Sequence, residues 1–503
     1  MNQASSESSI CVAVPENEAE KAVAALHEAF ALELDRSTVN SAYSLGGMSI
    51  VAVVGEGMCE VPGVTAKFMS ALAFANVNIR LIAQGSSERQ IAVVVDAKDA
   101  SKALRAVHMA FTLSETITSV SVLGASGRLG QALLKQLSSQ RDALRDDLKI
   151  EVRPVAATTS TTMVLDEGTS RGLDLDHIDE LLQESSGEIC IEGSCSHPLD
   201  LESLASFVEN DVNPHRIVVD CTTSEDVSNL YERWLGNGVN IICPSKLVVA
   251  GPIERYHSAN SAALRSGAMW QYESAVGAAL PIVGALRDLL ETGDKVKYIE
   301  GCVSGTLAHI LRSFTPEGEA GPTFGEAIGE TVEMGYTEPD VREDLSGIDM
   351  ARKTVALARE CGLEMLVEDV EVESLIPAEI VNKEYPKTMK DSEITEDALK
   401  SIGSSLDASM SEKLLKAREE NKVLRYRFFI DVEAGKAKCD LVAVDNAHPL
   451  YRLRDDENLC SFSTERYKNS PLIVKGSAAG AELAAAGIFA DILRLARVFN
   501  SQV

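Results

Sequence analysis

Apolar residues recur in the same order in two segments near the start of the chain. Residues 10–30 align without a gap to residues 91–111, and ten of the 21 aligned positions are identical. Each copy opens with β-branched residues, which favour a strand, and continues with apolar residues three or four positions apart, which is typical of an amphipathic helix. Each copy is therefore predicted to be a strand followed by a helix.

The segment between the two copies supplies the rest of a small fold. Residues 48–55 and 78–83 have the pattern of strands, and residues 62–75 have the pattern of a helix. With the second copy, these elements follow the β-α-β-β-α-β order of a ferredoxin-like unit. We expect this unit at residues 47–116, after a partial repeat and linker at residues 1–46.

Beyond residue 116, apolar strands alternate with helices. Such alternation indicates a doubly wound parallel sheet of the Rossmann type, with helices on its faces. We assign a nucleotide-binding domain to residues 117–250. Its strands are expected at 119–123, 149–156, 217–220 and 239–242, and its helices at 131–140 and 227–236.

From residue 251 the pattern is mixed and predicts an α+β domain. A helix is expected at residues 256–266, a strand at 268–273 and a long helix at 281–290. We place this catalytic and dimerisation domain at residues 251–475. A closing segment at residues 476–503 is expected to return to the nucleotide domain as a helix. The predicted fold class is therefore α/β and α+β.

The turn after the first strand of the doubly wound region is rich in glycine. It reads Gly-Ala-Ser-Gly-Arg-Leu-Gly at residues 124–130 and opens a predicted helix. Such glycines let backbone amides approach a pyrophosphate at the positive helix end, although a connector without a ligand has the same composition. The predicted dinucleotide contacts are Gly124, Ser126, Gly127, Arg128, Leu129 and Gly130, with Thr222, Thr223 and Ser224 after a later strand.

The end of the second strand bears on the choice of nicotinamide dinucleotide. An acidic residue usually binds the ribose of NAD there. Residues 156–160 read Ala-Ala-Thr-Thr-Ser, so no carboxylate would repel a 2′-phosphate, and Arg128 and Arg153 are the nearby cations. We therefore expect NADP(H) to be preferred over NAD(H).

Charge and cysteine usage exclude several classes of function. The 503 residues include 47 basic and 76 acidic side chains, and the net charge of −29 would repel nucleic acid and anionic membranes. The ten cysteines form no Cys-x-x-Cys pair, so we expect reduced thiols, neither a disulfide framework nor a zinc site.

The chain has no apolar run of the roughly 20 residues that span a bilayer, and its start lacks the basic and apolar parts of a secretory signal. A soluble intracellular protein is expected. Its location would be the cytoplasm, or a plastid if a presequence is missing.

Residues 335–353 contain five acidic and three basic side chains around a proline turn that leads into a helix. Within that helix, Asp349 and Lys353 are four residues apart and share one face, and Glu338 lies on the incoming loop. This arrangement suits a small zwitterionic substrate, although a capped helix with a surface ion pair has the same pattern. Three residues are candidates for the N-cap or the first-turn acid: Asp344, Ser346 and Asp349.

This segment and four others resemble the signature of the homoserine dehydrogenase family. The others are Cys-Pro-Ser-Lys at 243–246, Glu-Ser-Ala-Val-Gly-Ala-Ala-Leu-Pro at 273–281, Ser-Gly-Thr at 304–306 and the glycine-rich residues 475–491. Members of this family interconvert aspartate 4-semialdehyde and homoserine with a nicotinamide cofactor, in threonine and methionine biosynthesis. The resemblance covers residues 118–503.

The resemblance implies a role for each residue of this site. Lys353 is the expected acid/base, Asp349 is its orienting partner, and Lys246 gives electrostatic help and borders the cofactor. Glu338 is expected to bind the substrate amine. Further substrate contacts are expected from Tyr336, Thr337, Gly305, Thr306 and Asp344, and a further cofactor contact from Gly480.

The family also holds a monovalent cation, typically sodium, by one carboxylate and backbone carbonyls. The matching positions are Glu273, Val276, Ala278 and Leu280. Three positions depart from the family's pattern: Ser245 stands for an asparagine, and Ala279 and Ala478 stand for glycines. Because alanine resists a positive φ, the two alanines are the positions where the backbone is expected to differ or to be strained.

The residues before 118 resemble ACT domains, through Pro-Gly-Val at 62–64 and Asn-Val-Asn-Ile at 76–79. They are similar to the regulatory region of bifunctional aspartokinase/homoserine dehydrogenases, but nothing matches the Lys-Phe-Gly-Gly-Thr-Ser opening of aspartokinases, which implies that the kinase domain is absent. The predicted effector, threonine by pathway logic, would contact Asn78, Ile82 and Gln84. A packing and dimerisation unit without a ligand is the alternative.

The chain is thus interpreted as an NADP-preferring member of this family with an allosteric input. A homodimer or higher oligomer through the sheet of the catalytic domain is expected, and a separate aspartokinase is a candidate partner. Two other interpretations stay open: a non-catalytic, ACT-based protein that senses amino acids, and a related semialdehyde reductase.

Overall fold

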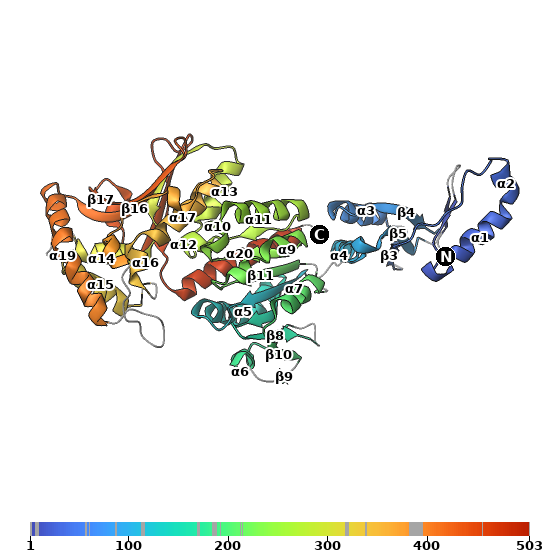
Figure 1. The fold of residues 1–503 in the computed structure, drawn as a ribbon, viewed down its shortest axis with the longest axis horizontal. Coiled ribbons are helices and arrows are strands. Elements are labelled where there is room, and N and C mark those ends of the chain that lie inside the picture. Colours follow the sequence, from blue (N-terminus) through green and yellow to red (C-terminus); the bar gives the residue numbers. More distant parts are fainter. Residues whose placement is uncertain are drawn as a thin grey trace. The chain divides into compact units, whose positions relative to one another are not determined.

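The chain folds into two compact units, one made mainly of residues 1–117 and the other mainly of residues 118–497 (Figure 1). Each unit has its own hydrophobic core. The computed structural model describes residues 3–5, 10–55, 58–59, 61–85, 88–111, 116–167, 172–183, 189–191, 193–211, 213, 215–316, 321–335, 337, 340–381, 396–454 and 456–501.

The first unit is built on a three-stranded antiparallel sheet with two helices. Its elements are β3 (Met48–Val54), α3 (Val64–Phe74), β4 (Ile79–Gln84), β5 (Gln90–Asp96) and α4 (Ala100–Phe111), and the strand order is β3-β5-β4. Ile91, Val93 and Val95 of β5 pack with Phe68 and Leu72 of α3, because alternate side chains of a strand point to the same face.

The predicted ferredoxin-like order is present up to its fifth element. The strand after α4 is β6 (Thr116–Leu123), which pairs with β11 (His215–Asp220) in another sheet. Among the described residues, the small sheet therefore has three strands where four are expected. Residues 118–123 are all buried, so β6 suits the centre of a sheet that is covered on both faces.

The two copies of the repeat share their elements but differ in burial. As predicted, the first copy forms a strand, β2 (Ile10–Val12), and a helix, α1 (Ala19–Ala29); β1 (Gln3–Ser5) pairs with β2, and α2 (Ala31–Asp35) follows. No residue of α1 is buried, and Ile10 is 68% exposed, whereas the matching Ile91 is 1% exposed. The described part of the first copy therefore has no packed core of its own.

The second unit contains an eight-stranded sheet in the order β13-β12-β11-β6-β7-β8-β10-β9. The strands not yet given are β7 (Ile150–Thr158), β8 (Thr162–Asp166), β9 (Ile189–Ile191), β10 (Ser194–Pro198), β12 (Asn240–Ile242) and β13 (Trp270–Gln271). Strands β13, β12, β11 and β6 run parallel, but β7, β8, β10 and β9 pair antiparallel. The predicted parallel sheet is right for one half. The other half is antiparallel; short turns join β7 to β8 and β9 to β10, and such turns permit antiparallel pairing but not parallel pairing.

The helices of this region are α5 (Arg128–Leu148), α6 (Ile178–Gln183), α7 (Leu201–Asn210), α8 (Glu225–Ser228), α9 (Tyr231–Gly236), α10 (Lys246–Val249) and α11 (Ile253–Ser266). The single helix predicted at residues 227–236 is thus two short helices, α8 and α9. Ser224 caps α8, which ends before α9 begins.

A six-stranded, mainly antiparallel sheet forms the second half of this unit, in the order β15-β17-β16-β14-β18-β19. Its strands are β14 (Val296–Cys302), β15 (Glu371–Val372), β16 (Val423–Asp431), β17 (Lys436–Val444), β18 (Glu457–Thr464) and β19 (Leu472–Ser477). Its helices are α12 (Ser274–Gly277), α13 (Ile282–Glu291), α14 (Gly305–Phe314), α15 (Phe324–Glu333), α16 (Val341–Leu345), α17 (Ile348–Glu360), α18 (Ala378–Val381) and α19 (Glu396–Glu419). Helices α14, α17 and α19 pack against β16.

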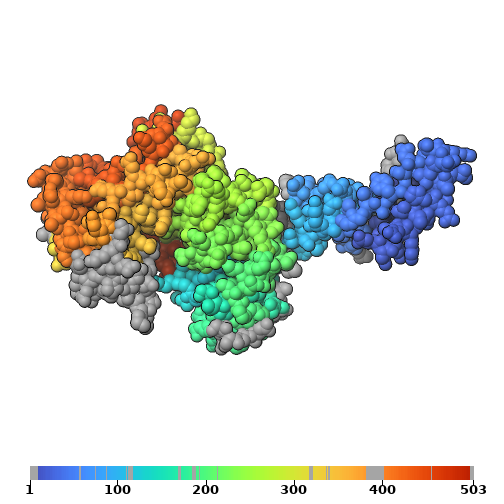
Figure 2. Space-filling view, viewed as in Figure 1, coloured from blue at the N-terminus to red at the C-terminus, as the bar shows by residue number. Residues whose placement is uncertain are grey.

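The last helix, α20 (Ala481–Ser501), returns to the nucleotide-binding sheet. Gln136 on α5 donates a hydrogen bond of 2.8 Å to the carbonyl of Glu482, and Ser274 donates one of 3.1 Å to the carbonyl of Ala484. Figure 2 shows part of α20, in dark red, between the orange and the cyan parts of this unit. Within the described chain, no helix has both the length and the apolar character needed to cross a membrane.

One prediction about the cysteines is wrong. Cys190 and Cys195 form a disulfide bond, because the pairing of β9 with β10 places them directly opposite each other with their Cα atoms 4.1 Å apart. The other eight cysteines are free thiols, as expected. The spacing of cysteines in the sequence does not reveal a bond that depends on hairpin register.

Candidate active site

The structure brings Lys246, Asp349 and Lys353 together in one ionic cluster. Asp349 Oδ1 lies 2.8 Å from Lys246 Nζ, and Asp349 Oδ2 lies 2.8 Å from Lys353 Nζ. Lys353 Nζ also donates a hydrogen bond of 2.8 Å to the carbonyl of Val303. The shared helix face of Asp349 and Lys353 is confirmed, and Asp349 additionally joins α17 to α10.

The environment keeps Asp349 ionised. The residue is 7% exposed, and the side chains of Lys246 and Lys353 are 23% and 15% exposed. Burial alone would raise the pKa of Asp349, but the ammonium groups of Lys353 and Lys246 outweigh burial and hold this pKa well below its ordinary value. At neutral pH, Asp349 is therefore a carboxylate that fixes both lysine side chains.

A glycine starts the helix that carries this cluster. Gly347 occupies the N-cap position of α17 with φ of +78°, a conformation that other residues resist. Asp349 is the acid of the first turn, as expected. The prediction that Asp344 or Ser346 is the N-cap of α17 is wrong: Asp344 lies within the preceding helix α16, and Ser346 is the C-cap of α16.

Lys246 is the first residue of α10, and Ser245 caps this short helix. Ser245 Oγ accepts a hydrogen bond of 3.4 Å from the amide of Leu247. Serine and asparagine are comparable N-caps. The serine that stands for the family's asparagine therefore keeps the cap and the position of Lys246.

The start of α14 borders the cluster. Ser304 caps this helix by accepting a hydrogen bond of 3.2 Å from the amide of Leu307. Gly305 and Thr306, predicted to contact substrate, form the first turn. They follow Val303, whose carbonyl binds Lys353, with only the cap Ser304 between.

The other predicted substrate contacts are placed less fully. Tyr336 and Glu338 lie outside the described residues. Thr337 is half-buried, and Asp344 is buried in α16. Their contacts with substrate remain predictions.

Two positions of the turn after β6, Gly124 and Gly130, favour glycine. Gly124 has φ of +78°. A side chain at Gly130 would collide with the backbone of Gly124 and Ala125. Gly127 is the N-cap of the 21-residue α5 and offers no side-chain cap. The positive end of a long helix thus meets a bare backbone turn, an arrangement that suits a phosphate.

The turn after β11 lies against the glycine-rich turn. A side chain at Gly124 would come within 3.1 Å of the carbonyl of Cys221 and of the methyl group of Thr222. Asp220 fixes Thr222 by accepting hydrogen bonds of 2.8 Å from its amide and 2.6 Å from its hydroxyl group. The two segments predicted to bind the cofactor are therefore neighbours, and Asp220 is a supporting residue that sequence reasoning missed.

The end of β7 also reaches this site. The carbonyl of Thr158 accepts a hydrogen bond of 2.7 Å from the amide of Ala125. A turn of hydroxyl residues at 159–161 follows, without a carboxylate. Arg128, at the start of α5, is exposed.

The support expected from Arg153 is wrong. Arg153 pairs with Glu151 on β7. It lies five residues before the end of the strand, a distance of about 16 Å at ~3.3 Å per residue. Proximity in sequence suggested a neighbour of the cofactor, but an extended strand carries this residue away.

The predicted cation ligands precede α13 in the chain, and one of them, Glu273, contacts the start of this helix. Glu273 is 3% exposed, and its carboxylate accepts hydrogen bonds of 2.7 Å and 2.9 Å from the amides of Val283 and Gly284. Ala278 has φ of +55°, so the strain expected at Ala279 falls one residue earlier, at a predicted carbonyl ligand. Strained residues of this kind concentrate at functional sites.

The predicted ligands offer the types of oxygen donor that a monovalent cation takes. One buried carboxylate with backbone carbonyls is a set of hard oxygen ligands. In the described chain, no group of three or more His, Cys, Asp or Glu residues could hold a metal ion, so the further ligands would be carbonyl oxygens. Two residues of α20 that the sequence did not indicate lie beside Glu273: Asp491 accepts a hydrogen bond of 3.3 Å from its amide, and Arg494 Nη1 is 3.4 Å from its carboxylate.

Gly480, predicted to contact the cofactor, directly precedes α20 and has φ of +98°. Ala478 does not adopt a positive φ, and its amide donates a hydrogen bond of 2.9 Å to the carbonyl of Asp456. The alanine that stands for glycine there causes no backbone strain.

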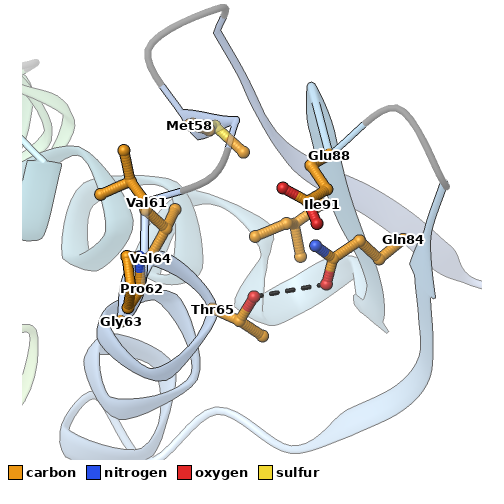
Figure 3. A pocket seen from close by; sticks show the side chains of 9 residues that line it. All are labelled: Met58, Val61, Pro62, Gly63, Val64, Thr65, Gln84, Glu88 and Ile91. Carbon is orange, nitrogen blue, oxygen red and sulfur yellow. Dashed lines mark hydrogen bonds between the residues drawn. The ribbon is translucent and has the colours of Figure 1, made fainter.

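The first unit contains a pocket of about 370 Å³ at the start of α3 (Figure 3). Of the three predicted effector contacts, the described lining includes Gln84, whose Oε1 accepts a hydrogen bond of 3.3 Å from Thr65 Oγ1. Asn78 directly precedes β4 and is six residues before Gln84, about 20 Å at ~3.3 Å per residue. Ile82 is 50% exposed and lies outside the lining. The other lining residues are Met58, Val61, Pro62, Gly63, Val64, Glu88 and Ile91.

Models of known protein families match most of the chain. Residues 126–273 match the model described as homoserine dehydrogenase, NAD binding domain, and residues 281–493 match that of homoserine dehydrogenase. Residues 1–30 and 51–111 match an ACT domain.

Individual proteins agree with these models. The chain is 40% identical to bifunctional aspartokinase/homoserine dehydrogenase 2, chloroplastic, of Zea mays, over 99% of this chain and 51% of that protein. It is 29% identical to homoserine dehydrogenase of Saccharomyces cerevisiae, over 76% of this chain and 99% of the yeast protein. A hyperthermophilic archaeal homoserine dehydrogenase in complex with NADPH shares the fold with a TM-score of 0.53, at 21% identity over 75% of this chain and 97% of that one.

The chain spans about half the length of the curated bifunctional relatives it matches. Within the second unit, the NAD-binding match covers most of the half with the eight-stranded sheet, and the homoserine dehydrogenase match covers the half with the six-stranded sheet. These matches do not favour the interpretation as a non-catalytic sensor. The chain belongs to the homoserine dehydrogenase family of oxidoreductases, with an ACT domain ahead of its NAD-binding and catalytic domains.

Proposed function

We propose that this chain interconverts L-aspartate 4-semialdehyde and L-homoserine with a nicotinamide cofactor, and that NADP(H) is preferred. The observation that carries the proposal is Asp349, which holds Lys246 and Lys353 at 2.8 Å each. Reduction of a carbonyl group needs a proton donor and positive charge at the carbonyl oxygen. This cluster supplies both in one half-buried place.

Each residue of the cluster has a separate task. When bound, the cofactor gives a hydride to the aldehyde carbon or accepts one from the alcohol carbon. Lys353 gives a proton to the alkoxide oxygen that forms in reduction, and takes the hydroxyl proton in oxidation. Asp349 and the carbonyl of Val303 hold Lys353 Nζ in place. Lys246 adds positive charge for the substrate's oxygen atoms, and Glu338 is proposed to bind the substrate amine.

Oxidation of L-homoserine tests this reaction. Purified chain with oxidised cofactor is expected to raise the near-ultraviolet absorbance of reduced cofactor when homoserine is added. L-serine, which is one carbon shorter, is the matched control and is expected to give no rise. No rise with homoserine, with either NADP or NAD, would exclude the proposed activity.

The preference for NADP(H) is supported by the absence of a carboxylate at residues 156–162 and by the exposed Arg128. Replacing Arg128 with alanine is expected to raise the KM for NADPH about tenfold, because one charge-assisted hydrogen bond to a phosphate contributes ~1.5 kcal/mol or more. The KM for NADH is expected to stay within about twofold, since NADH lacks the 2′-phosphate. Steady-state kinetics with both cofactors measures the difference.

Arg141→Ala is the matched control, because Arg141 is an exposed arginine on the same helix, 13 residues further on and about 20 Å away at ~1.5 Å per residue. Equal changes in the KM for NADPH and NADH in Arg128→Ala would contradict the proposed phosphate contact.

A monovalent cation such as sodium is proposed at Glu273, with the carbonyl oxygens of Val276, Ala278 and Leu280. The buried carboxylate and the strained backbone at Ala278 support this assignment. The ion would stabilise the turn between α12 and α13, next to α20.

An amino-acid effector such as threonine is proposed for the pocket of the first unit. Its volume of about 370 Å³ suits a small ligand. Thr65, Gln84 and Glu88 offer polar groups among apolar neighbours, and Gly63 begins α3 without a side-chain cap (Figure 3). The helix N-terminus suits a carboxylate, and the glutamate suits an amine.

Replacing Gln84 with alanine is expected to weaken threonine binding about tenfold, because a lost hydrogen bond in such a site costs ~1–1.5 kcal/mol. Calorimetry on the full chain measures the affinity. Ile82→Ala, on the same strand but outside the lining, is the control and should bind as the parent chain does. Absence of heat in the parent chain at high threonine would favour the packing unit without a ligand.

A homodimer or higher oligomer through the six-stranded sheet is proposed, because Tyr298 is 40% exposed and stacks on Phe429 of this sheet. A separate aspartokinase is a proposed partner, since the maize relative joins both names in one protein. A location in the cytoplasm or a plastid remains a prediction.

A further inference from the structure

Arg359 is a buried cation at the end of the catalytic helix. It lies ten residues after Asp349 on α17 and is 4% exposed. Its Nη1 donates a hydrogen bond of 2.8 Å to the carbonyl of Val249, and its Nη2 donates one of 2.8 Å to the carbonyl of Gly251. Its Nε donates a third bond, of 3.0 Å, to the carbonyl of Met365. Three bonds from one guanidinium group therefore end on backbone.

Two of these carbonyls lie at the end of the helix that carries Lys246: Val249 is its last residue, and Gly251 follows two residues later. Helix α10 is four residues long and ends at Val249. The last carbonyls of a helix have no partner within the helix. At its other end, Lys246 is bound to Asp349. The short helix is therefore attached to α17 twice, once through a side chain of its own and once through the guanidinium group of Arg359.

The arrangement is specific to arginine. A buried charge is costly unless its N–H groups are bonded, and burial lowers the pKa of Arg359. The carbonyls and the ring of Tyr256, 5.2 Å from the guanidinium carbon, compensate this cost. The planar fork of arginine fixes two carbonyls at once, whereas lysine offers one nitrogen atom.

The far end of α17 has a second, separate anchor. Glu360, the next residue, forms an ion pair of 2.7 Å with Arg287 of α13. Tyr272 also donates a hydrogen bond to Glu360. Loss of the bonds from Arg359 would therefore leave α17 attached to α13 and would loosen α10 instead.

We propose that Arg359 is a positioning residue that holds α10 against α17 and thereby keeps Lys246 at Asp349. The inference rests on the function proposed for this cluster. Because a misplacement of about 1 Å in an active site can cost ~100-fold in rate, a looser α10 lowers turnover although Arg359 acts only through the backbone.

Two variants and a matched control test the proposal. Arg359→Lys keeps the charge, and Arg359→Met keeps the length of the side chain. Arg425→Lys is the control: Arg425 is 1% exposed and also donates to carbonyls, those of Leu450 at 3.1 Å and Tyr451 at 3.0 Å. Both lysine variants should lower the melting temperature by similar amounts.

Kinetic and hydrogen-exchange measurements distinguish the variants at Arg359 from the control at Arg425. Relative to the parent chain, kcat is expected to fall about tenfold in Arg359→Lys and about 100-fold in Arg359→Met, with the KM for NADPH within about threefold. Amide hydrogen exchange at residues 246–251 is expected to quicken in both. In Arg425→Lys, kcat and this exchange are expected to stay as in the parent chain.

Unchanged kcat in Arg359→Lys, or a loss equal to that of Arg425→Lys, would overturn the proposal. If Arg359→Met fails to fold, Arg359→Lys and the parent chain still test the proposal. Amide exchange at residues 246–251 of the parent chain that is as fast as in an open loop would also overturn the proposal. An inactive parent chain would instead refute the proposed reaction, while the exchange data would still show whether Arg359 holds α10.

Discussion

Replacing Lys353 with alanine is expected to lower kcat for homoserine oxidation about 1000-fold, within the ~10²–10⁴-fold range of a general acid/base. The affinity for NADPH should stay within about twofold, because Asp349 and the carbonyl of Val303 bind Lys353, whereas the glycine-rich turn is the predicted phosphate site. Steady-state kinetics and a fluorescence titration of NADPH give the two values.

The control for this variant is Lys416→Ala. Lys416 lies on α19 in an exposed pair with Glu412, so its loss removes a lysine without touching the cluster. Turnover near that of the parent chain in Lys353→Ala would remove the acid/base assignment. A parallel loss of NADPH binding would point to a cofactor contact instead.

The sequence predicts the local half of this cluster and not the long-range half. Asp349 and Lys353 meet because a helix brings residues four apart onto one face. Lys246 belongs to another helix, and periodicity carries no information about which distant segments meet; only the resemblance to a family singled out this residue. The same holds for Arg359, which the sequence shows as one more arginine in an amphipathic helix.

Backbone groups are another part that a sequence does not display. The carbonyl of Val303 binds Lys353, but a residue type does not tell where its carbonyl points. The strain at Ala278 was expected one residue later, because propensities describe a residue and not the turn that it must close. Hairpin register, which joins Cys190 to Cys195, is likewise a property of the folded sheet.

Sheet topology was predicted only as far as strand patterns allow. The run of buried residues in β11 correctly indicates a strand covered on both faces. The same kind of run in β7 and β8 does not tell parallel from antiparallel pairing, because a strand that is covered on both faces is buried continuously in either arrangement. A short turn at residues 159–161 decides the matter, because a parallel crossover needs a dozen residues or more.

Replacing Asp349 with asparagine is expected to have the largest effect on stability, together with a loss of activity. The change keeps the shape but leaves the ammonium groups of Lys246 and Lys353 without their shared carboxylate. Removing one partner of a buried ion pair typically costs about 3–5 kcal/mol of unfolding free energy, and we expect a loss in that range at pH 7. A fall in kcat of about 100-fold should accompany it, because Lys353 loses its fixed position.

Urea unfolding at several pH values separates charge from packing in this variant. The folded chain lowers the pKa of Asp349 below its ordinary value of 3.8, so its stabilisation is fully present above that value and is lost as the pH falls below it. The difference in unfolding free energy between the parent chain and Asp349→Asn should therefore be constant near neutral pH and shrink in acid. Glu412→Gln, which breaks the exposed pair on α19, should leave the unfolding free energy nearly unchanged at any pH. A difference for Asp349→Asn that stays constant down to pH 3 would assign its cost to packing, and no difference at pH 7 would show that the carboxylate does not hold the two lysines.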